Sequence, residues 1–173
     1  DRAFILNLDT LEDVALPLYQ GVMINHFDFA AKYYVAGAGN RTQWADQEPG
    51  RKIIRPQFLM GQSTYQKENK PKIVFRTISN ATNERSLITS TIPGMPAGNS
   101  LGVLESEKDG LIALAANLSV FVFDYLLRLR MTGTNVNWFI LSELPVVKPA
   151  FIYGISKLAE VLTVNHICFA PYS

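Results

Sequence analysis

The sequence has little of the side-chain chemistry that marks a metal protein or a disulfide-stabilised one. Its one cysteine, Cys168, excludes an internal disulfide and a cysteine-rich zinc site. The two histidines, His26 and His166, do not have the H-x-x-x-H or H-E-x-x-H spacing of metal ligands. A single cysteine also suits a reducing cytosol. We therefore expect a cytoplasmic protein that binds no metal.

No apolar run is long enough to cross a membrane. The longest one, Leu111 to Phe123, is interrupted by Asn117 and Ser119, whereas a spanning helix needs about 20 apolar residues. The chain begins at Asp1, with no initiator methionine and no basic leader before an apolar run. From this we expect a fragment of something longer, with no membrane partner.

Motifs for catalysis are also missing. The glycine-containing stretches GAG at 37–39 and GMPAG at 94–98 lack the G-x-G-x-x-G spacing and the strand-to-helix context of a nucleotide-binding turn. The sequence has no G-x-S-x-G nucleophile elbow and no Pro-Asp…Asp/Glu-x-Lys nuclease pattern. We predict no catalytic residue in this chain, and hence that it is not itself an enzyme.

What is present is enough apolar sequence for one core. The chain has 173 residues, of which 48% are hydrophobic, and this predicts one domain over residues 1–173. Residues 163–173 have no clear pattern and are treated as a tail. We predict an α+β fold, with a twisted, mostly antiparallel sheet and two or three C-terminal helices.

Several segments have strand patterns. Residues 4–8 and 18–24 are short apolar runs, and residues 52–60 favour an edge strand because Pro56 cannot donate to a ladder. The β-branched runs 72–79 and 84–92 predict a hairpin closed by the loop NATN. Neither run alternates cleanly between apolar and polar residues, which indicates a sheet partly covered on both faces.

Apolar residues at three- and four-residue steps predict one long helix over residues 110–131. They are Leu111, Leu114, Leu118, Phe121, Val122, Tyr125 and Leu129. Asp124 lies four residues before Arg128 on the same face, so we expect a structural ion pair. Gly133 suits a left-handed position after the helix. A second helix is expected over residues 151–162.

Positive charge is concentrated in the middle of the chain. Residues 41–85 contain nine Lys and Arg against four Asp and Glu, a net of +5, although the whole chain carries only +1. The remainder has seven basic and eleven acidic residues, a net of −4. A basic middle can form a local electrostatic footprint for nucleic acid, or it can be solvated loop charge.

Three blocks of the sequence together point to a known family. They are LPLYQGVMINHFD at 16–28, VFRTISNATNERSLI at 74–88 and RLRMTGTNVNWFILSELP at 128–145. In this order they resemble the TaqI-like C-terminal specificity domain, the target-recognition domain of adenine-specific DNA methyltransferases and Type IIG-like restriction-modification enzymes. Two positions depart from the family pattern: Thr132 precedes Gly133 where a second glycine is usual, and Gln20 replaces the usual glutamate.

The resemblance implies a function and a set of partners. Such a domain reads double-stranded DNA across a cleft from an N-terminal methyltransferase or nuclease domain of the same protein. Catalysis, and the S-adenosylmethionine it uses, belong to that missing domain, because the Asp/Asn-Pro-Pro-aromatic loop is absent here. No cofactor is expected in this chain.

The expected DNA contacts are side chains that bind phosphate or base edges. They gather at the predicted hairpin, in the TGTN turn, in LPLYQG and in the basic segment 39–70, where base specificity is expected. The predicted residues are Tyr19, Gln20, Arg51, Arg55, Lys72, Arg76, Asn83, Glu84, Arg85, Thr134 and Asn135. For Arg76 and Arg85 a structural anchor is the alternative, and Asn135 and Asn137 can instead satisfy backbone groups.

Three other interpretations remain open. The chain can be a specificity subunit that pairs with methylase or nuclease chains through helices such as 110–131. It can be a purely structural docking domain, or a small hydrolase without a recognisable motif. His26 lies in an apolar segment and is expected to be a structural histidine with its hydrogen bonds satisfied, with a DNA contact as the alternative.

Overall fold

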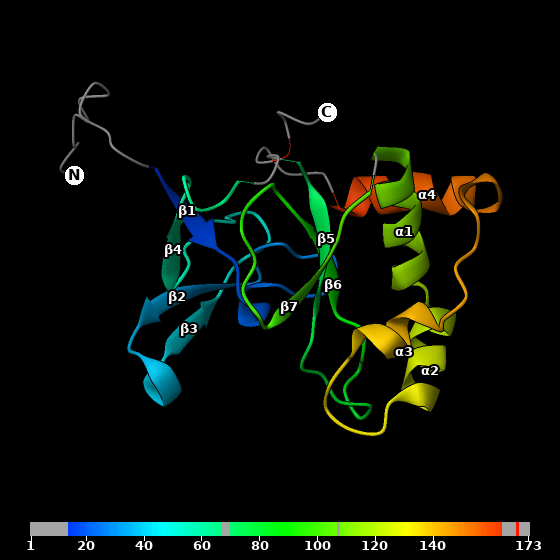
Figure 1. Ribbon diagram of the computed structural model, residues 1–173, viewed down its shortest axis with the longest axis horizontal. Coiled ribbons are helices and arrows are strands. Elements are labelled where there is room, and N and C mark those ends of the chain that lie inside the picture. Colours follow the sequence, from blue (N-terminus) through cyan, green and yellow to red (C-terminus); the bar gives the residue numbers. More distant parts are fainter. Residues whose placement is uncertain (1–13, 67–69, 107, 164–168, 170–173) are drawn as a thin grey trace.

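The computed structural model describes residues 14–66, 70–106, 108–163 and 169, and these form an α+β fold, as predicted. A three-stranded sheet stands in the middle, with four helices on one side and two small β-ladders on the other (Figure 1). The expected strand at residues 4–8 lies outside the described residues.

The central sheet has the order β6-β5-β7, formed by β5 (Lys72–Arg76), β6 (Thr89–Ile92) and β7 (Leu101–Leu104), and both of its ladders are antiparallel. Ile73 and Phe75 of β5 pack into a core with the helices, whereas Val74 packs into a second core on the opposite face. The predicted sheet covered on both faces is confirmed. Both faces need apolar residues, and this explains the unclean alternation.

Gly102 of β7 is required by this packing. It lies opposite Phe75 in the ladder, and a Cβ at position 102 would come within 2.2 Å of the Phe75 ring. The Phe75 ring in turn meets Trp138 edge-on, with ring centroids 5.0 Å apart. A glycine in the strand therefore makes room for the aromatic ring that joins the sheet to the helices.

Two further antiparallel ladders cover the other face. One pairs β1 (Ala15–Leu18) with β4 (Phe58–Gly61), and the other pairs β2 (Lys32–Ala36) with β3 (Gln43–Asp46). Short 3-10 helices follow β1 and β2, at Gly21–Met23 and Gly39–Arg41. At 18–24, where we expect a strand or a strand with a turn, β1 ends at Leu18 and a turn follows. The edge strand expected at 52–60 is confined to β4, because Pro56 precedes the paired residues.

The helical side contains α1 (Lys108–Ser119), α2 (Phe121–Arg130), α3 (Trp138–Ser142) and α4 (Pro149–Thr163). The prediction of one helix over 110–131 is wrong, because Val120 is extended and the chain bends there by 69°. Asn117 donates to the Ala113 carbonyl and also bonds Val147, which fixes the end of α1 to a distant segment. The helix at 151–162 is confirmed as part of α4.

Because of the bend, α2 buries a different side from the one that the helical spacing predicts. Phe123, Asp124 and Leu127 are the buried residues of α2. Phe121, Val122, Tyr125 and Leu129, which the pattern places in the core, are exposed. The left-handed position expected at Gly133 is also wrong, because among the described glycines only Gly37 and Gly39 have positive φ.

Candidate functional site

The site begins with the loop between β5 and β6. The two strands pair from Lys72–Ile92 to Phe75–Thr89, so the hairpin exists. Its loop is residues 77–88, not the four residues NATN, and β5 is an inner strand of a sheet. The hairpin is therefore part of a three-stranded sheet, not a free two-stranded ribbon.

Two side chains of α2 hold this loop in place. The buried carboxylate of Asp124 accepts hydrogen bonds from the backbone N–H groups of Ser86 and Leu87, at 2.9 and 2.7 Å. It also forms the predicted ion pair with Arg128, at 2.8 Å. The expectation of a structural pair four residues apart is confirmed.

Arg128 extends the same clamp along the loop. Its guanidinium donates to the carbonyl oxygens of Ala81, Asn83 and Glu84. A planar fork with five donors in a fixed geometry can bind several carbonyls and a carboxylate at once. Asp124 and Arg128 together fix the backbone on both sides of Arg85, and so determine where the side chains of residues 83–85 point.

Arg85 is held by the bend between α1 and α2. Its Nη2 donates to the Ser119 carbonyl at 2.9 Å, and its guanidinium carbon lies 4.0 Å from the centre of the Phe121 ring. Its Nη1 is buried and has no hydrogen-bond partner among the described residues. Arg85 is thus a structural anchor on a carbonyl and an aromatic ring, with one donor left over. No Asp or Glu among the described residues forms an ion pair with it, so the anchor has no acidic partner there.

A tight turn brings His26 to the same place. Asn25 and Asp28 exchange backbone hydrogen bonds at 2.8 and 2.9 Å, and Phe27, at the turn, has a positive φ of 59°. Bulky residues seldom adopt this conformation, so the surrounding contacts must impose it. One such contact is the bond from the Phe27 N–H to the Thr89 carbonyl of β6, at 3.0 Å.

The prediction that His26 is a satisfied structural histidine is wrong. Its Nδ1 and Nε2 are buried and have no hydrogen-bond partner among the described residues. Burial lowers the pKa of His26 to about 4, and the Arg85 guanidinium contributes in the same direction. Asp124 and the Ser119 backbone act the opposite way, with smaller effect. The imidazole is therefore neutral at pH 7 and offers one donor and one acceptor.

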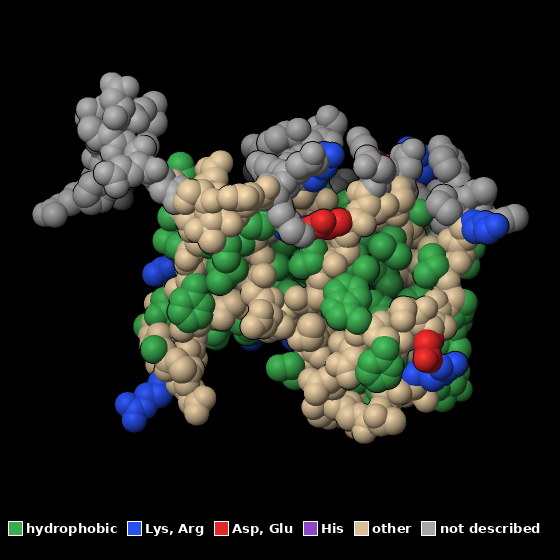
Figure 2. Space-filling view, viewed as in Figure 1, with side chains coloured by type: hydrophobic (Ala, Val, Ile, Leu, Met, Phe, Trp, Pro, Cys, Tyr) green, Lys and Arg blue, Asp and Glu red, His purple; other side chains and the backbone are tan. Residues whose placement is uncertain are grey.

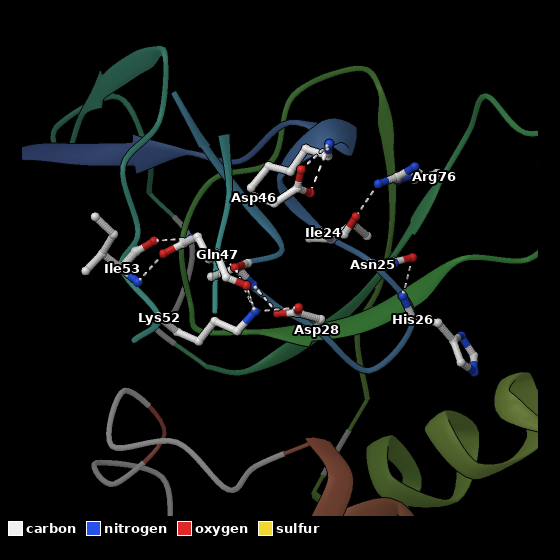
Figure 3. Close-up of polar contacts among 11 residues, drawn as sticks. Ile24, Asn25, His26, Asp28, Asp46, Gln47, Lys52, Ile53 and Arg76 are labelled. Carbon is white, nitrogen blue, oxygen red and sulfur yellow. Dashed lines mark hydrogen bonds and ion pairs between the residues drawn. The ribbon is translucent and has the colours of Figure 1, made fainter. Parts of the chain in front are cut away.

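Arg76 supports the other side of the turn. Its Nε donates to the Gly21 carbonyl at 2.8 Å, and its Nη2 donates to the Ile24 carbonyl. Figure 3 shows Arg76 reaching the Ile24 carbonyl, while the His26 ring points away toward the helices. Partial burial lowers the pKa of Arg76 from its usual value, but an arginine stays charged at pH 7. The observed contacts match the structural alternative for this residue.

These residues enclose one open cavity of about 540 Å³. Its lining contains four of the predicted residues, Arg76, Asn83, Glu84 and Arg85, together with Asn25, His26 and Ile88. Asn25, Asn83 and Glu84 are exposed and supply amide and carboxylate groups. The cavity therefore offers charged and neutral hydrogen-bond donors, and also acceptors. Three buried polar atoms beside it, Nδ1 and Nε2 of His26 and Nη1 of Arg85, have no partner among the described residues.

The other predicted residues lie elsewhere. Tyr19 and Lys72 are buried, the latter against the Tyr65 ring, so neither can reach DNA in this conformation. Gln20 forms a long 3.5 Å hydrogen bond with Gln57. The side chains of Arg51 and Arg55 are exposed, the latter 6.0 Å from the Tyr33 ring.

Thr134 and Asn135 pair with the chain that continues β5. The Ser79 N–H donates to the Thr134 carbonyl at 2.8 Å, and Asn135 forms an isolated bridge with Ile78. The main chain makes these bonds, and the Asn137 side chain makes no cap hydrogen bond at α3. The exposed Thr134 and Asn135 side chains lie outside the lining of the cavity.

The basic segment 39–70 is more regular than predicted, because it contains β3 and β4. Lys52 forms a 2.6 Å ion pair with Asp28, and Gln47 bonds both the Ala30 carbonyl and the Ile53 backbone (Figure 3). These two side chains therefore stabilise the fold. On the face drawn in Figure 2, the Lys and Arg side chains stand apart and form no continuous patch.

Sequence reasoning missed the cavity residues Asn25 and His26. The turn-forming Asn-His-Phe-Asp stretch signals a tight turn, but not its contact with residues 83–85, which are about 60 positions away. In the described part of the chain, no three His, Cys, Asp or Glu side chains gather into a possible metal site.

Across the described ranges, no single helix is long and apolar enough to span a membrane. The bent pair Gly110–Ser119 and Phe121–Arg130 meets that test only when its two helices are taken together. The comparisons with known proteins add no relative: no protein-family model, no curated protein and no solved structure matches this chain.

Proposed function

We propose that this chain is the DNA target-recognition module of a restriction-modification adenine methyltransferase, with catalysis in a part of the protein outside this chain. The observation that supports it best is the shared cavity of Arg76, Asn83, Glu84 and Arg85. These residues were predicted together as DNA contacts from the family resemblance. Arginine suits guanine, asparagine suits adenine and glutamate suits cytosine, so the exposed edge of this cavity has the side chains for direct base readout.

The hydrogen bonds separate the residues that hold the loop in place from those that are free to contact DNA. Arg76 and Arg85 donate to backbone carbonyls, so their first task is to hold the turn and the loop. Asn83 and Glu84 are exposed beside them, on a backbone that Arg128 fixes. We assign base reading to Asn83, Glu84 and the neighbouring Asn25, in place of the segment 39–70 where the sequence led us to expect it. Arg51 and Arg55 are candidates for phosphate contacts.

The experiment is selection of bound sequences from a pool of random duplexes at low salt, followed by binding measurements over a salt series. We expect salt-sensitive binding that enriches a sequence. Asn83→Ala combined with Glu84→Gln should remove the enrichment and keep non-specific binding, whereas Arg51→Ala with Arg55→Ala should weaken binding to all sequences and reduce the salt slope. Lys148→Ala combined with Lys157→Ala is the control, because it also removes two exposed positive charges.

Two results would contradict the proposal. One is absence of binding at low salt by a chain whose circular dichroism shows it to be folded. The other is binding that all the site variants leave unchanged.

A second candidate function is docking of a methylase or nuclease chain, as in a specificity subunit. It is favoured by the outer face of α4, where Ile155, Leu158, Val161 and Leu162 are exposed. Contiguous exposed apolar surface marks an interaction site in many proteins. Pull-down of a purified methylase chain, lost on Leu158→Asp, would test it.

A further inference from the structure

The helix α2 presents an apolar stripe to solvent. Phe121, Val122, Tyr125 and Leu129 are between 60% and 77% exposed. At about 100° per residue these four positions share one side of the helix, opposite Phe123 and Leu127 in the core. A surface helix normally places charged or polar residues on this side. The solvent side of α2 is therefore apolar, where a helix that faces only water would be polar.

The charges of α2 do not interrupt the stripe. Asp124 is buried and paired with Arg128, which reaches to the loop at residues 81–84, and Arg130 pairs with Glu143. Every charged side chain of this helix thus has its partner within the chain. A two-fold interface places identical surfaces against each other, so a like-charged patch would repel its own copy. The charged side chains of α2 therefore add no like charge to the stripe, and the Arg85 guanidinium lies against its first residue, Phe121.

The spacing within the stripe is symmetrical. Phe121 precedes Tyr125 by four residues, and Leu129 follows it by four. Two copies of α2 that cross antiparallel at Tyr125 would place each Phe121 against the other copy's Leu129. The antiparallel arrangement also opposes the two helix dipoles favourably.

The area of the stripe fits a weak dimer. Four side chains with these exposed fractions present on the order of 500 Å², so two copies would bury about 1,000 Å² in total, near the lower limit for a specific interface. From these observations we propose that α2 is a homodimer contact, in which a second copy of this chain packs its own α2 antiparallel across the stripe. The expected dissociation constant is in the micromolar range.

The first test is sedimentation velocity of the whole chain over a wide concentration series, from about 1 to about 500 µM. We expect a monomer at the low end and a dimer at the high end. Leu129→Asp should weaken dimerisation at least ten-fold, because it places two carboxylates in an apolar contact. Leu158→Asp on α4 is the matched control, being similarly exposed, and should leave the dimer unchanged.

The second test establishes the register, in a Cys168→Ser background. Tyr125→Cys should form an intermolecular disulfide, because it lies at the proposed two-fold axis. Leu129→Cys alone should not, because the two Leu129 positions would lie about 12 Å apart along the helices, beyond disulfide reach. Phe121 is left unchanged because its ring supports Arg85.

A chain that stays monomeric throughout the series would overturn the proposal. A dimer that Leu158→Asp abolishes and Leu129→Asp does not would also overturn it. So would equal cross-linking at both cysteine positions. Neither test uses DNA, so the result is independent of the proposed recognition function.

Discussion

Asp124 is the residue on which the site loop most depends. It is buried, and it satisfies two backbone N–H groups and one guanidinium at once. Asp124→Ala would leave those donors without a partner and Arg128 without its counter-ion. We expect a loss of about 3 to 5 kcal/mol in the free energy of unfolding, measured by urea denaturation.

Glu143→Ala is the matched control, because it removes one partner of an exposed ion pair with Arg130. Exposed pairs contribute about 1 kcal/mol or less. An Asp124→Ala variant no less stable than Glu143→Ala would contradict the clamp described for α2.

His26 gives the site a dependence on pH. Its pKa is about 4 in the folded chain, below the ordinary value of 6.5. As pH falls below 6.5, the unfolded chain binds a proton at this position while the folded chain does not. Stability is therefore present above pH 6.5 and is lost progressively between pH 6.5 and 4, by about 2 kcal/mol in total, because solvent reaches part of the imidazole and screens the effect.

The measurement compares unfolding of the native chain and of His26→Gln from pH 7.5 to pH 4. The native chain should lose stability relative to the variant as the solution becomes acidic. A constant difference between the two chains would show that His26 titrates normally, and the NMR titration of its ring protons would settle the pKa directly.

At the scale of elements, Asn117 joins the end of α1 to a distant part of the chain. Its amide donates to the Val147 carbonyl and accepts from the Val147 N–H, at 3.1 and 2.8 Å, and so joins the end of α1 to the segment before α4. Asn117→Ala should cost about 2 to 3 kcal/mol, because two backbone groups lose their partner. Amide hydrogen exchange should rise at Val147 and along α4.

Ser119→Ala is the comparison for this variant. The Ser119 hydroxyl donates to the Ala115 carbonyl in its own helix, at 2.6 Å, so its loss should leave exchange in α4 unchanged. Equal exchange in the two variants would mean that Asn117 does not fix α4.

The same elements show how far local pattern could predict this fold. The strands β5 and β6 and the helix α4 follow from β-branched runs and helical spacing, which act within a few residues. The bend at Val120 and the length of the loop at 77–88 do not. Both depend on hydrogen bonds between residues about 30 to 47 positions apart, such as Asn117 with Val147 and Arg128 with Ala81.

The candidate site also has residues that local sequence could predict and residues that it could not. Asn83, Glu84 and Arg85 could be predicted together because they are adjacent in the chain and belong to one block. His26 could not be added to them, because only the fold brings the turn at 25–28 to this loop. The apolar spacing of α2 predicted burial, but at that helix it indicates an exposed stripe, since periodicity does not say which side of a helix is covered.

At the scale of the whole molecule, β5 joins two cores that lie on opposite faces of one sheet. Ile73 and Phe75 belong to the core under the helices, and Val74 to the core under the small β-ladders. A change on either face of β5 therefore moves the strand that the other core needs. The two sides are expected to unfold together, in a single cooperative transition.

The two tryptophans allow a direct measurement of this cooperativity. Trp44 packs against the core on the β-ladder side, and Trp138 lies against Phe75 on the helical side. In Trp44→Phe the fluorescence reports the helical side alone, and in Trp138→Phe it reports the other side. For each single-tryptophan chain we expect the fluorescence transition in urea to coincide with its circular-dichroism transition.

Val74→Ala, whose side chain belongs only to the β-ladder core, should lower the midpoint seen by Trp138 as much as the one seen by Trp44. A Trp138 midpoint that Val74→Ala leaves in place would mean that the helical side folds independently of the sheet's other face.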